Sequence, residues 1–231
     1  MNLLAFDAAT TSCSVACWSD GIITEEYIDC SKKQQAEILI PMILRTMEKA
    51  KFNFSSLNGI AVTVGPGSFT GVRIGLATAR GLALASELPL IGVTTLQTLA
   101  AAVSKPKSDE IIAATLDARR NQLYIQIFWN AEKPLSDPFV ISLDNLPTYL
   151  SSKFPEKPRI TLVGSGSTII AEFLYKLDWR FTIPDVPHYP QANLITKIVA
   201  KRGRNLREQT TVRPLYLRNP SIGREHKTVK P

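Results

Sequence analysis

Residues 59–89, GIAVTVGPGSFTGVRIGLATARGLALASELP, consist in order of a strand, a glycine loop and a helix. The apolar and β-branched residues 59–64 predict a buried strand, and Gly65-Pro66-Gly67 predicts a turn. The helical pattern that follows continues to Leu88, directly before Pro89. A strand that enters a helix through a glycine loop predicts an α/β fold, and the loop is a candidate phosphate cradle.

The predicted elements of the chain occur twice in the same order. Residues 1–104 contain a strand hairpin, a third strand, and helices 31–50 and 71–87 with shorter elements between and after them. The Lys/Pro/Ser stretch 105–109 ends this pattern, and residues 105–231 repeat it as far as a last helix at about 191–202. Each half predicts the order βββαβαβα, a mixed five-stranded sheet with helices on its faces. Two such lobes resemble the actin, Hsp70 and sugar-kinase (ASKHA) superfamily.

This resemblance implies a ligand cleft between the lobes. In the superfamily the two hairpin turns face the phosphates of a metal-bound nucleotide, and the matching positions here are Asp7 and Asp117. Thr10 lies in the first turn, and Gly164 and Gly166 form the glycine loop of the second lobe. The alternative interpretation of both acids is that Asp is favoured in turns.

The first glycine loop lacks the features of known phosphate motifs. The dinucleotide pattern GxGxxG requires glycine at Thr70, and a Walker loop requires Gly-Lys-Ser/Thr where this chain has Gly71-Val72-Arg73. The first hairpin turn also has no glycine that would let the backbone approach a phosphate closely. We therefore expect no cofactor of the chain's own and a vestigial nucleotide cleft, formed by Asp7, Thr10, Asp117, Gly164 and Gly166.

Metal and nucleophile chemistry have little support in the sequence. His188 and His226 are far apart and belong to no HxxxH or HExxH pair, and there is no GxSxG motif. Cys13, Cys17 and Cys30 form no CxxC pair, and we expect them to be reduced structural thiols. The sequence predicts neither a metal site nor catalytic residues.

The helix 71–87 carries two stripes of small residues. One stripe is explained by packing on the helix's own sheet, whereas the second, which includes Ala77 and Gly81, indicates that another helix approaches. Arg73 and Arg80 border an apolar patch on the face away from the first stripe, which predicts a partner surface. The alternative is a tightly packed core helix with two solvated arginines.

Positive charge is concentrated at the C-terminal end of a chain with a net charge of +7. Residues 197–231 contain ten Lys or Arg against Glu208 and Glu225, so the net charge of +8 there leaves −1 for the rest. The basic tail 203–231 could touch RNA in an auxiliary role at most, and a solvated terminus is the simpler explanation. The first residues lack a basic signal region and no apolar run approaches 18 residues, so we expect a cytoplasmic protein that does not enter a membrane.

Several segments together resemble the TsaB family, also called YeaZ. The glycine-rich segment, whose GPGSFTGxRxG pattern is highly specific, is joined by motifs along nearly the whole chain. These are LLAFDAATTSCSVA at 3–16, AEILIPMI at 36–43, VGPGSFTGVRIGLATARGLA at 64–83, LDARRNQLY at 116–124 and RPLYLR at 213–218.

The resemblance implies a non-catalytic role in forming N6-threonylcarbamoyladenosine beside the anticodon of tRNAs that read codons beginning with A. In the family, TsaD transfers the threonylcarbamoyl group, TsaB binds TsaD, and the ATPase TsaE joins them. The contact with TsaD, and a competing homodimer, use the first two helices. Carried over by position, the partner-binding residues are Gln35, Ile38, Leu39, Met42, Arg73, Leu76, Ala77, Arg80 and Leu84.

The chain departs from the family pattern at two places, and alternatives remain open. Gln35-Ala36 stands where relatives often have His-Ser, which weakens the inference at Gln35, and Ala8-Ala9 stands where they have Thr-Ser. The rival functions are an actin-like ATPase or kinase, a glycoprotease-like peptidase, which the missing histidine pair disfavours, and an RNA-binding module. Also open are whether the resting state is a homodimer or a heterodimer, and whether an adenine nucleotide is shared at the partner interface.

Overall fold

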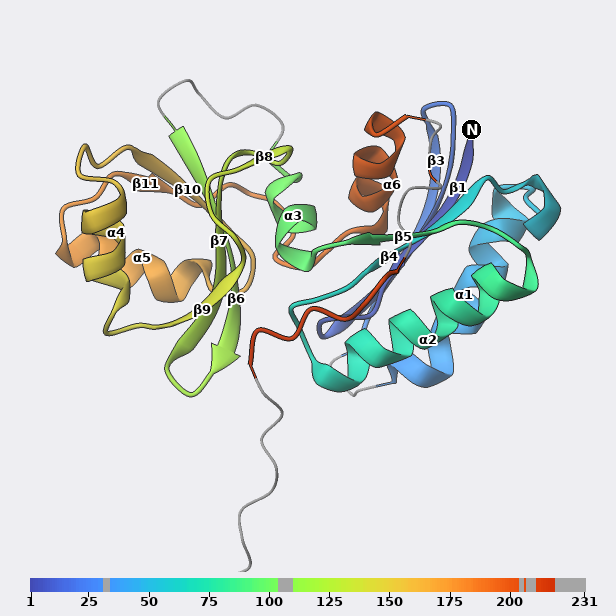
Figure 1. Cartoon of the computed structure of the whole chain (residues 1–231), viewed down its shortest axis with the longest axis horizontal. Helices are drawn as coiled ribbons and strands as arrows, with labels where there is room; N and C mark the ends of the chain where they lie inside the picture. Colours follow the sequence, from blue (N-terminus) through green and yellow to red (C-terminus); the bar gives the residue numbers. More distant parts are fainter. Residues whose placement is uncertain (31–33, 104–109, 204–205, 207–210, 219–231) are drawn as a thin grey trace, which may run out of the picture.

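A computed structural model describes residues 1–30, 34–103, 110–203, 206 and 211–218. The chain forms two lobes, each built on one β-sheet, which lie side by side (Figure 1). The stretch 105–109 and the start of the predicted first helix at Ser31 lie outside the described residues. Most of the tail 203–231 also lies outside them, apart from Gly203, Leu206 and residues 211–218.

The sheet of the first lobe is five-stranded and mixed, as the sequence predicts. Its order is β3-β2-β1-β4-β5. The pairs β1·β2 and β2·β3 are antiparallel, whereas β1·β4 and β4·β5 are parallel. The strands are β1 (Asn2–Asp7), β2 (Ser12–Ser19), β3 (Ile22–Asp29), β4 (Gly59–Thr63) and β5 (Leu90–Val93).

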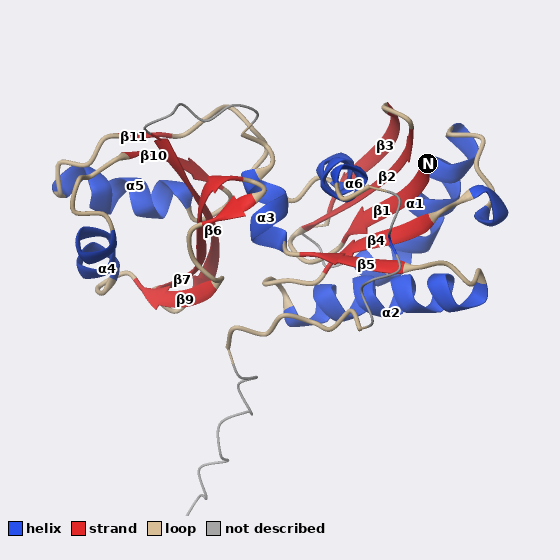
Figure 2. Ribbon diagram, turned by 45° about the horizontal axis from the view of Figure 1, so that its top comes forward, coloured by secondary structure: helices blue, strands red, loops and turns tan. Residues whose placement is uncertain are grey.

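Helices cover both faces of this sheet. The helices α1 (Gln35–Lys49) and α2 (Phe69–Ala85) contact each other and pack on one face, over a core that includes Phe6 and Val62. A short 3-10 helix, η1 (Phe54–Ser56), precedes β4. Figure 2 shows α2 and α6 (Ala192–Lys201) on opposite faces, and α6 packs against Leu3 and Ala5. Burial on both faces explains why the central strands are almost wholly apolar.

The second lobe repeats the topology of the first and adds one strand. Its sheet is six-stranded, with β6 at the centre between β10 and β7, β11 beyond β10, and β9 and β8 both paired with β7. The two-residue β8 is the addition, so the predicted count of five strands is one too low for this lobe. The strands are β6 (Glu110–Arg119), β7 (Gln122–Asn130), β8 (Lys133–Pro134), β9 (Phe139–Ser142), β10 (Arg159–Val163) and β11 (Phe181–Thr182).

The lobes exchange helices at their junction. The short α3 (Thr95–Ala100) follows the first sheet in the chain but packs through Leu96 and Leu99 on the second, whereas α6 follows the second sheet and packs on the first. The second lobe's own helices are α4 (Leu146–Lys153) and α5 (Ser167–Lys176). A boundary near residue 104 therefore separates the strands of the two lobes, but not their helices.

Residues 211–218 return from α6 to lie along α2 and end at the second lobe (Figure 1). Val212 is buried in the core beneath α2, and the backbone N–H of Leu215 donates to the carbonyl oxygen of Val64 at 2.7 Å. At the far end, Arg218 Nη1 donates to the carbonyl oxygen of Ala118 at 3.2 Å. This part of the predicted basic tail thus connects the two lobes.

Candidate functional site

The predicted cleft between the lobes exists. A cavity of about 530 Å³ opens where the first hairpin turn and the start of α2 meet the β6–β7 hairpin. It lies at the carboxyl ends of the parallel strands, where open α/β sheets bind ligands. Its lining is rich in hydroxyl groups and consists of Ala9, Thr10, Thr11, Gly67, Ser68, Leu116, Asp117, Ala118, Arg119, Tyr124, Ser165, His188 and Tyr189.

Asp7 does not line this cleft, contrary to the prediction. Its side chain is 0% exposed at the end of β1, where Oδ1 accepts hydrogen bonds from the Thr63 hydroxyl at 2.5 Å and from the Ala9 N–H at 3.2 Å. Oδ2 has no hydrogen-bond partner among the described residues. Burial raises the pKa of this carboxyl to about 7 despite the two hydrogen bonds, which act in the opposite direction. The register of β1 places Asp7 inside the lobe, so the side chain cannot reach a ligand.

Asp117 does line the cleft and is exposed. Its Oδ1 accepts the backbone N–H of Arg119 at 2.7 Å, two residues further on, as Asp7 accepts that of Ala9. The two acids therefore make the same local turn contact, which fits the predicted repeat. Their surroundings differ, because only Asp117 faces solvent.

The glycines of the second loop are buried against β6 and do not line the cavity. A Cβ on Gly164 would lie 2.1 Å from the carbonyl oxygen of Thr115, and one on Gly166 would lie 2.8 Å from the Thr115 hydroxyl. These glycines are needed for close packing of the loop on β6. Of the five predicted cleft residues, Thr10 and Asp117 line the cavity, with Ser165 between the two glycines.

The cleft has donors for an anion but few ligands for a metal. Ser68, the N-cap of α2, and Ser165, two residues before α5 begins, border it, and helix N-termini favour negative charge. Among the described residues, no group of three or more His, Cys, Asp and Glu side chains could hold a metal ion. Asp117 is the sole carboxylate in the lining, so the residues present fit a phosphate better than a metal-bound nucleotide.

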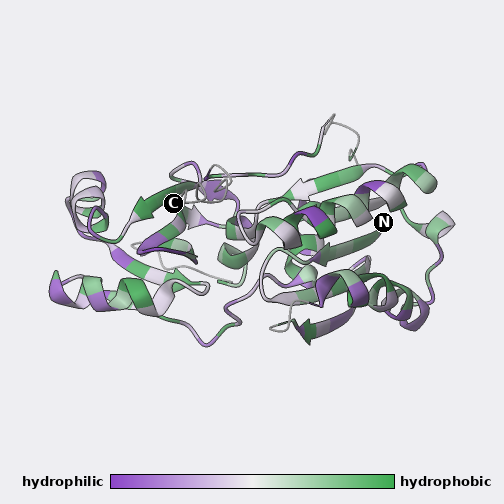
Figure 3. Ribbon diagram, turned by 90° about the horizontal axis from the view of Figure 1, so that it is seen from below, coloured by the Kyte–Doolittle hydropathy of each residue, from purple (hydrophilic) through white to green (hydrophobic). Residues whose placement is uncertain are grey.

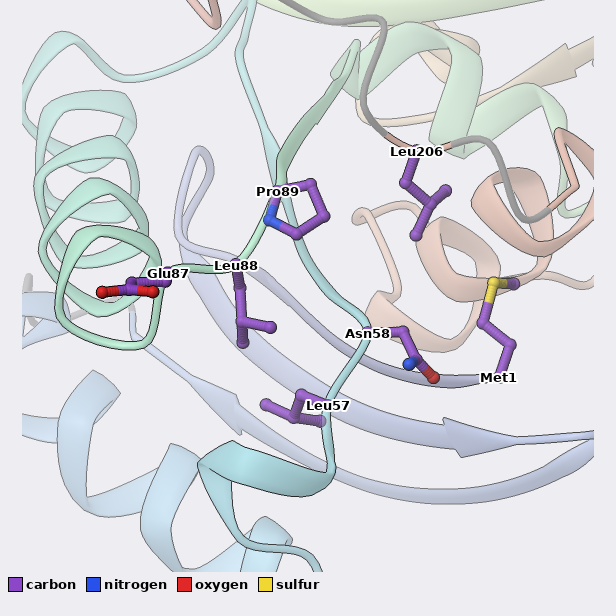
Figure 4. A pocket seen from close by; sticks show the side chains of 7 residues that line it. All are labelled: Met1, Leu57, Asn58, Glu87, Leu88, Pro89 and Leu206. Carbon is purple, nitrogen blue, oxygen red and sulfur yellow. The ribbon is translucent and has the colours of Figure 1, made fainter.

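Another cavity lies at the opposite end of the first sheet (Figure 4). It has a volume of about 490 Å³ and is lined by residues just before β1, β4 and β5, that is, at the amino ends of the parallel strands. This end of an open sheet is not where ligands bind. The lining residues are Met1, Leu57, Asn58, Glu87, Leu88, Pro89 and Leu206.

The predicted partner-binding residues differ in how far they are exposed. Gln35, Leu39, Met42 and Leu76 are buried, because they form the side of each helix that packs on the sheet. Gln35 Nε2 donates to the carbonyl oxygen of Thr10 at 3.0 Å, so it anchors α1 to the first turn. Ile38 is partly buried, which leaves an exposed group of Arg73, Ala77, Arg80 and Leu84.

The exposed side of α1 and α2 carries large apolar side chains, of which only Leu84 was among the predicted partner-binding residues. Leu84 of α2 is 83% exposed, and Ile40 and Leu44 of α1, which the prediction missed, are 41% and 55% exposed. A Cβ on Gly81 would meet nothing within 4 Å. Figure 3, which views the molecule from below, shows hydrophobic segments interspersed with hydrophilic ones along the helices facing the viewer. We call Ile40, Leu44, Ala77, Gly81 and Leu84 the exposed helix face.

Arg73 and Arg80 hold the chain's own C-terminal segment. Arg80 Nη2 donates to the carbonyl oxygen of Val212 at 2.7 Å, and Arg73 Nε donates to the Tyr216 hydroxyl at 3.1 Å. The guanidinium of Arg73 also lies 3.6 Å from the ring centroid of Phe69, which in turn contacts the Tyr216 ring at 5.3 Å. The pattern of α2 identified two exposed arginines, but nothing local to α2 indicates that residues 211–218 lie beside them.

None of the helices in the described ranges combines the length and the apolar composition that a membrane span requires.

The three cysteines are free and buried, and burial raises the pKa of the Cys17 thiol to about 12. Such thiols are unreactive.

Sequence comparisons relate this chain to proteins of tRNA threonylcarbamoyladenosine formation. The profile of the family described as "TsaD: tRNA N6-adenosine threonylcarbamoyltransferase" matches residues 26–200. The protein TsaB of Escherichia coli K12 is 41% identical over 124 residues, which cover 54% of this chain and 53% of the relative. TsaB of Buchnera aphidicola subsp. Schizaphis graminum is 32% identical over 171 residues, or 71% of this chain and 78% of the relative. The matched part thus spans about half the length of the E. coli relative.

Solved structures share the fold. The crystal structure of a Pseudomonas aeruginosa protein, described as uncharacterized with similarity to peptidase YEAZ, is 27% identical, and the match has a TM-score of 0.76 over 94% of this chain and 99% of that one. Component A of the (R)-2-hydroxyglutaryl-CoA dehydratase of Acidaminococcus fermentans is 8% identical, with a TM-score of 0.53 over 87% of this chain and 98% of that one. The second likeness concerns the fold alone.

Proposed function

This chain belongs to the TsaB family, also called YeaZ, and we propose that it is a non-catalytic subunit of the assembly that forms threonylcarbamoyladenosine in tRNA. In this proposal it docks on a TsaD-like transferase. The profile that matches residues 26–200 is named for that transferase, so the two proteins are related in sequence.

The observation that carries the proposal is the exposed helix face. Leu84 is 83% exposed and Leu44 is 55% exposed, on two helices that contact each other. Gly81 adds open space at the surface, although glycine in a helix interior costs about 1 kcal/mol relative to alanine. Close approach of a partner's backbone would offset that cost, and large apolar side chains gathered on one face are typical of protein interfaces.

Two properties of the cleft support a non-catalytic role. The carboxyl of Asp7 is buried, which excludes it from contact with a ligand, and Asp117 faces the cavity without a second carboxylate. A phosphotransferase of this superfamily uses such acids together around a metal-bound nucleotide. The hydroxyl-rich lining could still hold the phosphates of an adenine nucleotide shared with a partner.

The remaining parts of the proposal concern the assembly. A TsaE-like ATPase joins the complex through the transferase, and the isolated chain forms a homodimer through the same exposed helix face. The protein works in the cytoplasm, where tRNA is modified. One apolar surface that serves both contacts makes the homodimer and the heterodimer mutually exclusive.

The test is to purify the chain with a TsaD-like partner and replace one exposed leucine. We expect Leu84→Glu to prevent co-elution, because a carboxylate would be buried in an apolar interface. The matched control is Ile22→Glu on β3, where the wild-type side chain is 76% exposed, and this variant should co-elute normally. Normal co-elution of Leu84→Glu would contradict docking through this face.

A further inference from the structure

The turn between β6 and β7 is backbone-strained and carries two arginines. Three consecutive residues without glycine have left-handed φ angles: Arg119 at 60°, Arg120 at 55° and Asn121 at 58°. A residue with a Cβ pays a steric cost in this region, which Asn tolerates better than Arg. A shift in the register of the β6·β7 ladder between Asp117 and Arg119 accompanies the turn.

The hairpin between β2 and β3 offers a comparison within the same chain. There the two left-handed residues are Asp20 and Gly21, with φ angles of 44° and 99°. Asp-Gly is a preferred pair for tight hairpins. The arginines at 119 and 120 are therefore unfavourable for the turn itself, and such strain is retained where the side chains serve a function.

Both arginines are exposed, and neither has an ion pair among the described residues. The neighbouring carboxylate, Asp117, contacts the backbone N–H of Arg119. Arg218 lies against the same turn. Its guanidinium donates hydrogen bonds to the carbonyl oxygen of Ala118 and to Oε1 of Gln122. Three arginines thus lie in this turn or donate hydrogen bonds to it.

This turn forms one rim of the cleft. Arg119 lines the cavity together with hydroxyl donors that include Thr10, Thr11 and Ser165. Guanidinium and hydroxyl groups are the donors that contact phosphate oxygens in nucleic-acid complexes.

We propose that the Arg119-Arg120 turn is a contact site for the phosphate backbone of RNA. Contacts of this kind are insensitive to base sequence and strongly dependent on salt. Both arginines are exposed, so a phosphate group can reach either side chain. The choice of RNA over other polyanions rests on the proposed role in tRNA modification.

The test measures binding of fluorescently labelled tRNA to the full chain as a function of salt. The double variant Arg119→Gly/Arg120→Gly should bind about tenfold more weakly at 0.1 M salt, and the slope of log K against log[salt] should shrink by about 1.4–1.8 for two lost phosphate contacts. Because glycine relieves the left-handed strain, the same variant should melt about 2–4 °C higher than wild type. Greater stability combined with weaker binding is a result that damage to the fold cannot produce.

The matched control is Lys51→Gly, which also removes an exposed cationic side chain from a residue with a left-handed φ angle, in this case 57°. Lys51 follows the end of α1 that lies away from the cleft. It should raise the melting temperature and leave tRNA binding unchanged. Unchanged tRNA affinity in the double variant would overturn the proposal. So would loss of co-elution with the TsaD-like partner while tRNA affinity stays at the wild-type value. Because Leu84→Glu tests docking separately, failure of the docking proposal is distinguishable from failure of this one.

Discussion

The hydroxyl of Thr63 donates a hydrogen bond of 2.5 Å to Oδ1 of Asp7 inside the first lobe. The two residues end the adjacent parallel strands β4 and β1, at the edge of the sheet where related folds place ligands. Here the carboxyl has turned inward, with Oδ2 lacking a hydrogen-bond partner among the described residues. Ionisation of the Asp7 carboxyl therefore destabilises the folded state and does not contribute to ligand binding.

The first prediction is that Asp7 makes the fold less stable as pH rises. Well below pH 3.8 the carboxyl is neutral in both states, but as pH rises the unfolded chain ionises near 3.8 and the folded chain only near 7. The free energy of unfolding should therefore fall between these values, by about 4 kcal/mol at 1.36 kcal/mol per pKa unit. Asp7→Asn should remove this fall and be more stable than wild type at pH 8. Urea denaturation of both proteins at pH 5 and pH 8 measures the difference, and equal pH dependence would contradict the burial of an ionisable Asp7.

The second prediction separates the two small-residue stripes of α2. A Cβ on Gly71 would lie 2.1 Å from the carbonyl oxygen of Ala8, whereas one on Gly81 would meet nothing within 4 Å. Gly71→Ala should destabilise the chain by about 3 kcal/mol, because the clash is with backbone. Gly81→Ala should stabilise it by about 1 kcal/mol, because alanine is the better helix former. Thermal unfolding of the two variants gives shifts of opposite sign if one stripe is packed and the other is open.

The third prediction concerns the contacts that hold residues 211–218 against α2. Arg80→Met keeps much of the side-chain stem but removes the donor to the Val212 carbonyl, so we expect a loss of about 1–2 kcal/mol of stability. The amide of Leu215, which bonds to Val64, should exchange with deuterium faster in this variant. The control Arg45→Met removes an exposed pair with Glu26 and should leave that amide unaffected. Slow exchange at Leu215 in both variants would mean that Arg80 does not hold the segment.

Much of the fold could be predicted from the sequence because its signals are local. The glycine loop at 65–67 and the helix after it have the predicted order, and so do the repeated strands of the second lobe. The exchange of α3 and α6 between lobes has no local signal, because an amphipathic helix does not show which sheet it covers. The two-residue β8 is too short for a period to be recognised.

The candidate site was predictable only in part, for similar reasons. The turn residue Asp117 faces the cleft as expected, but the register of β1 decides that Asp7 faces the interior, and register depends on pairing across the sheet. On α1, carrying residues over by position selected Leu39 and Met42, which are buried, rather than Ile40 and Leu44. Only the packing of α1 on its sheet distinguishes these two sides, because the helix is apolar almost all round.

The most direct test of the account is a reconstituted tRNA modification assay with a TsaD-like transferase, a TsaE-like ATPase and this chain. Formation of threonylcarbamoyladenosine should require the chain, be lost with Leu84→Glu, and continue with Asp7→Asn and Asp117→Asn. That pattern would establish docking through the exposed helix face as the essential contribution. Loss of product with Asp117→Asn, in a variant that still co-elutes with the transferase, would contradict the account, because it would place a catalytic step in this chain's own cleft.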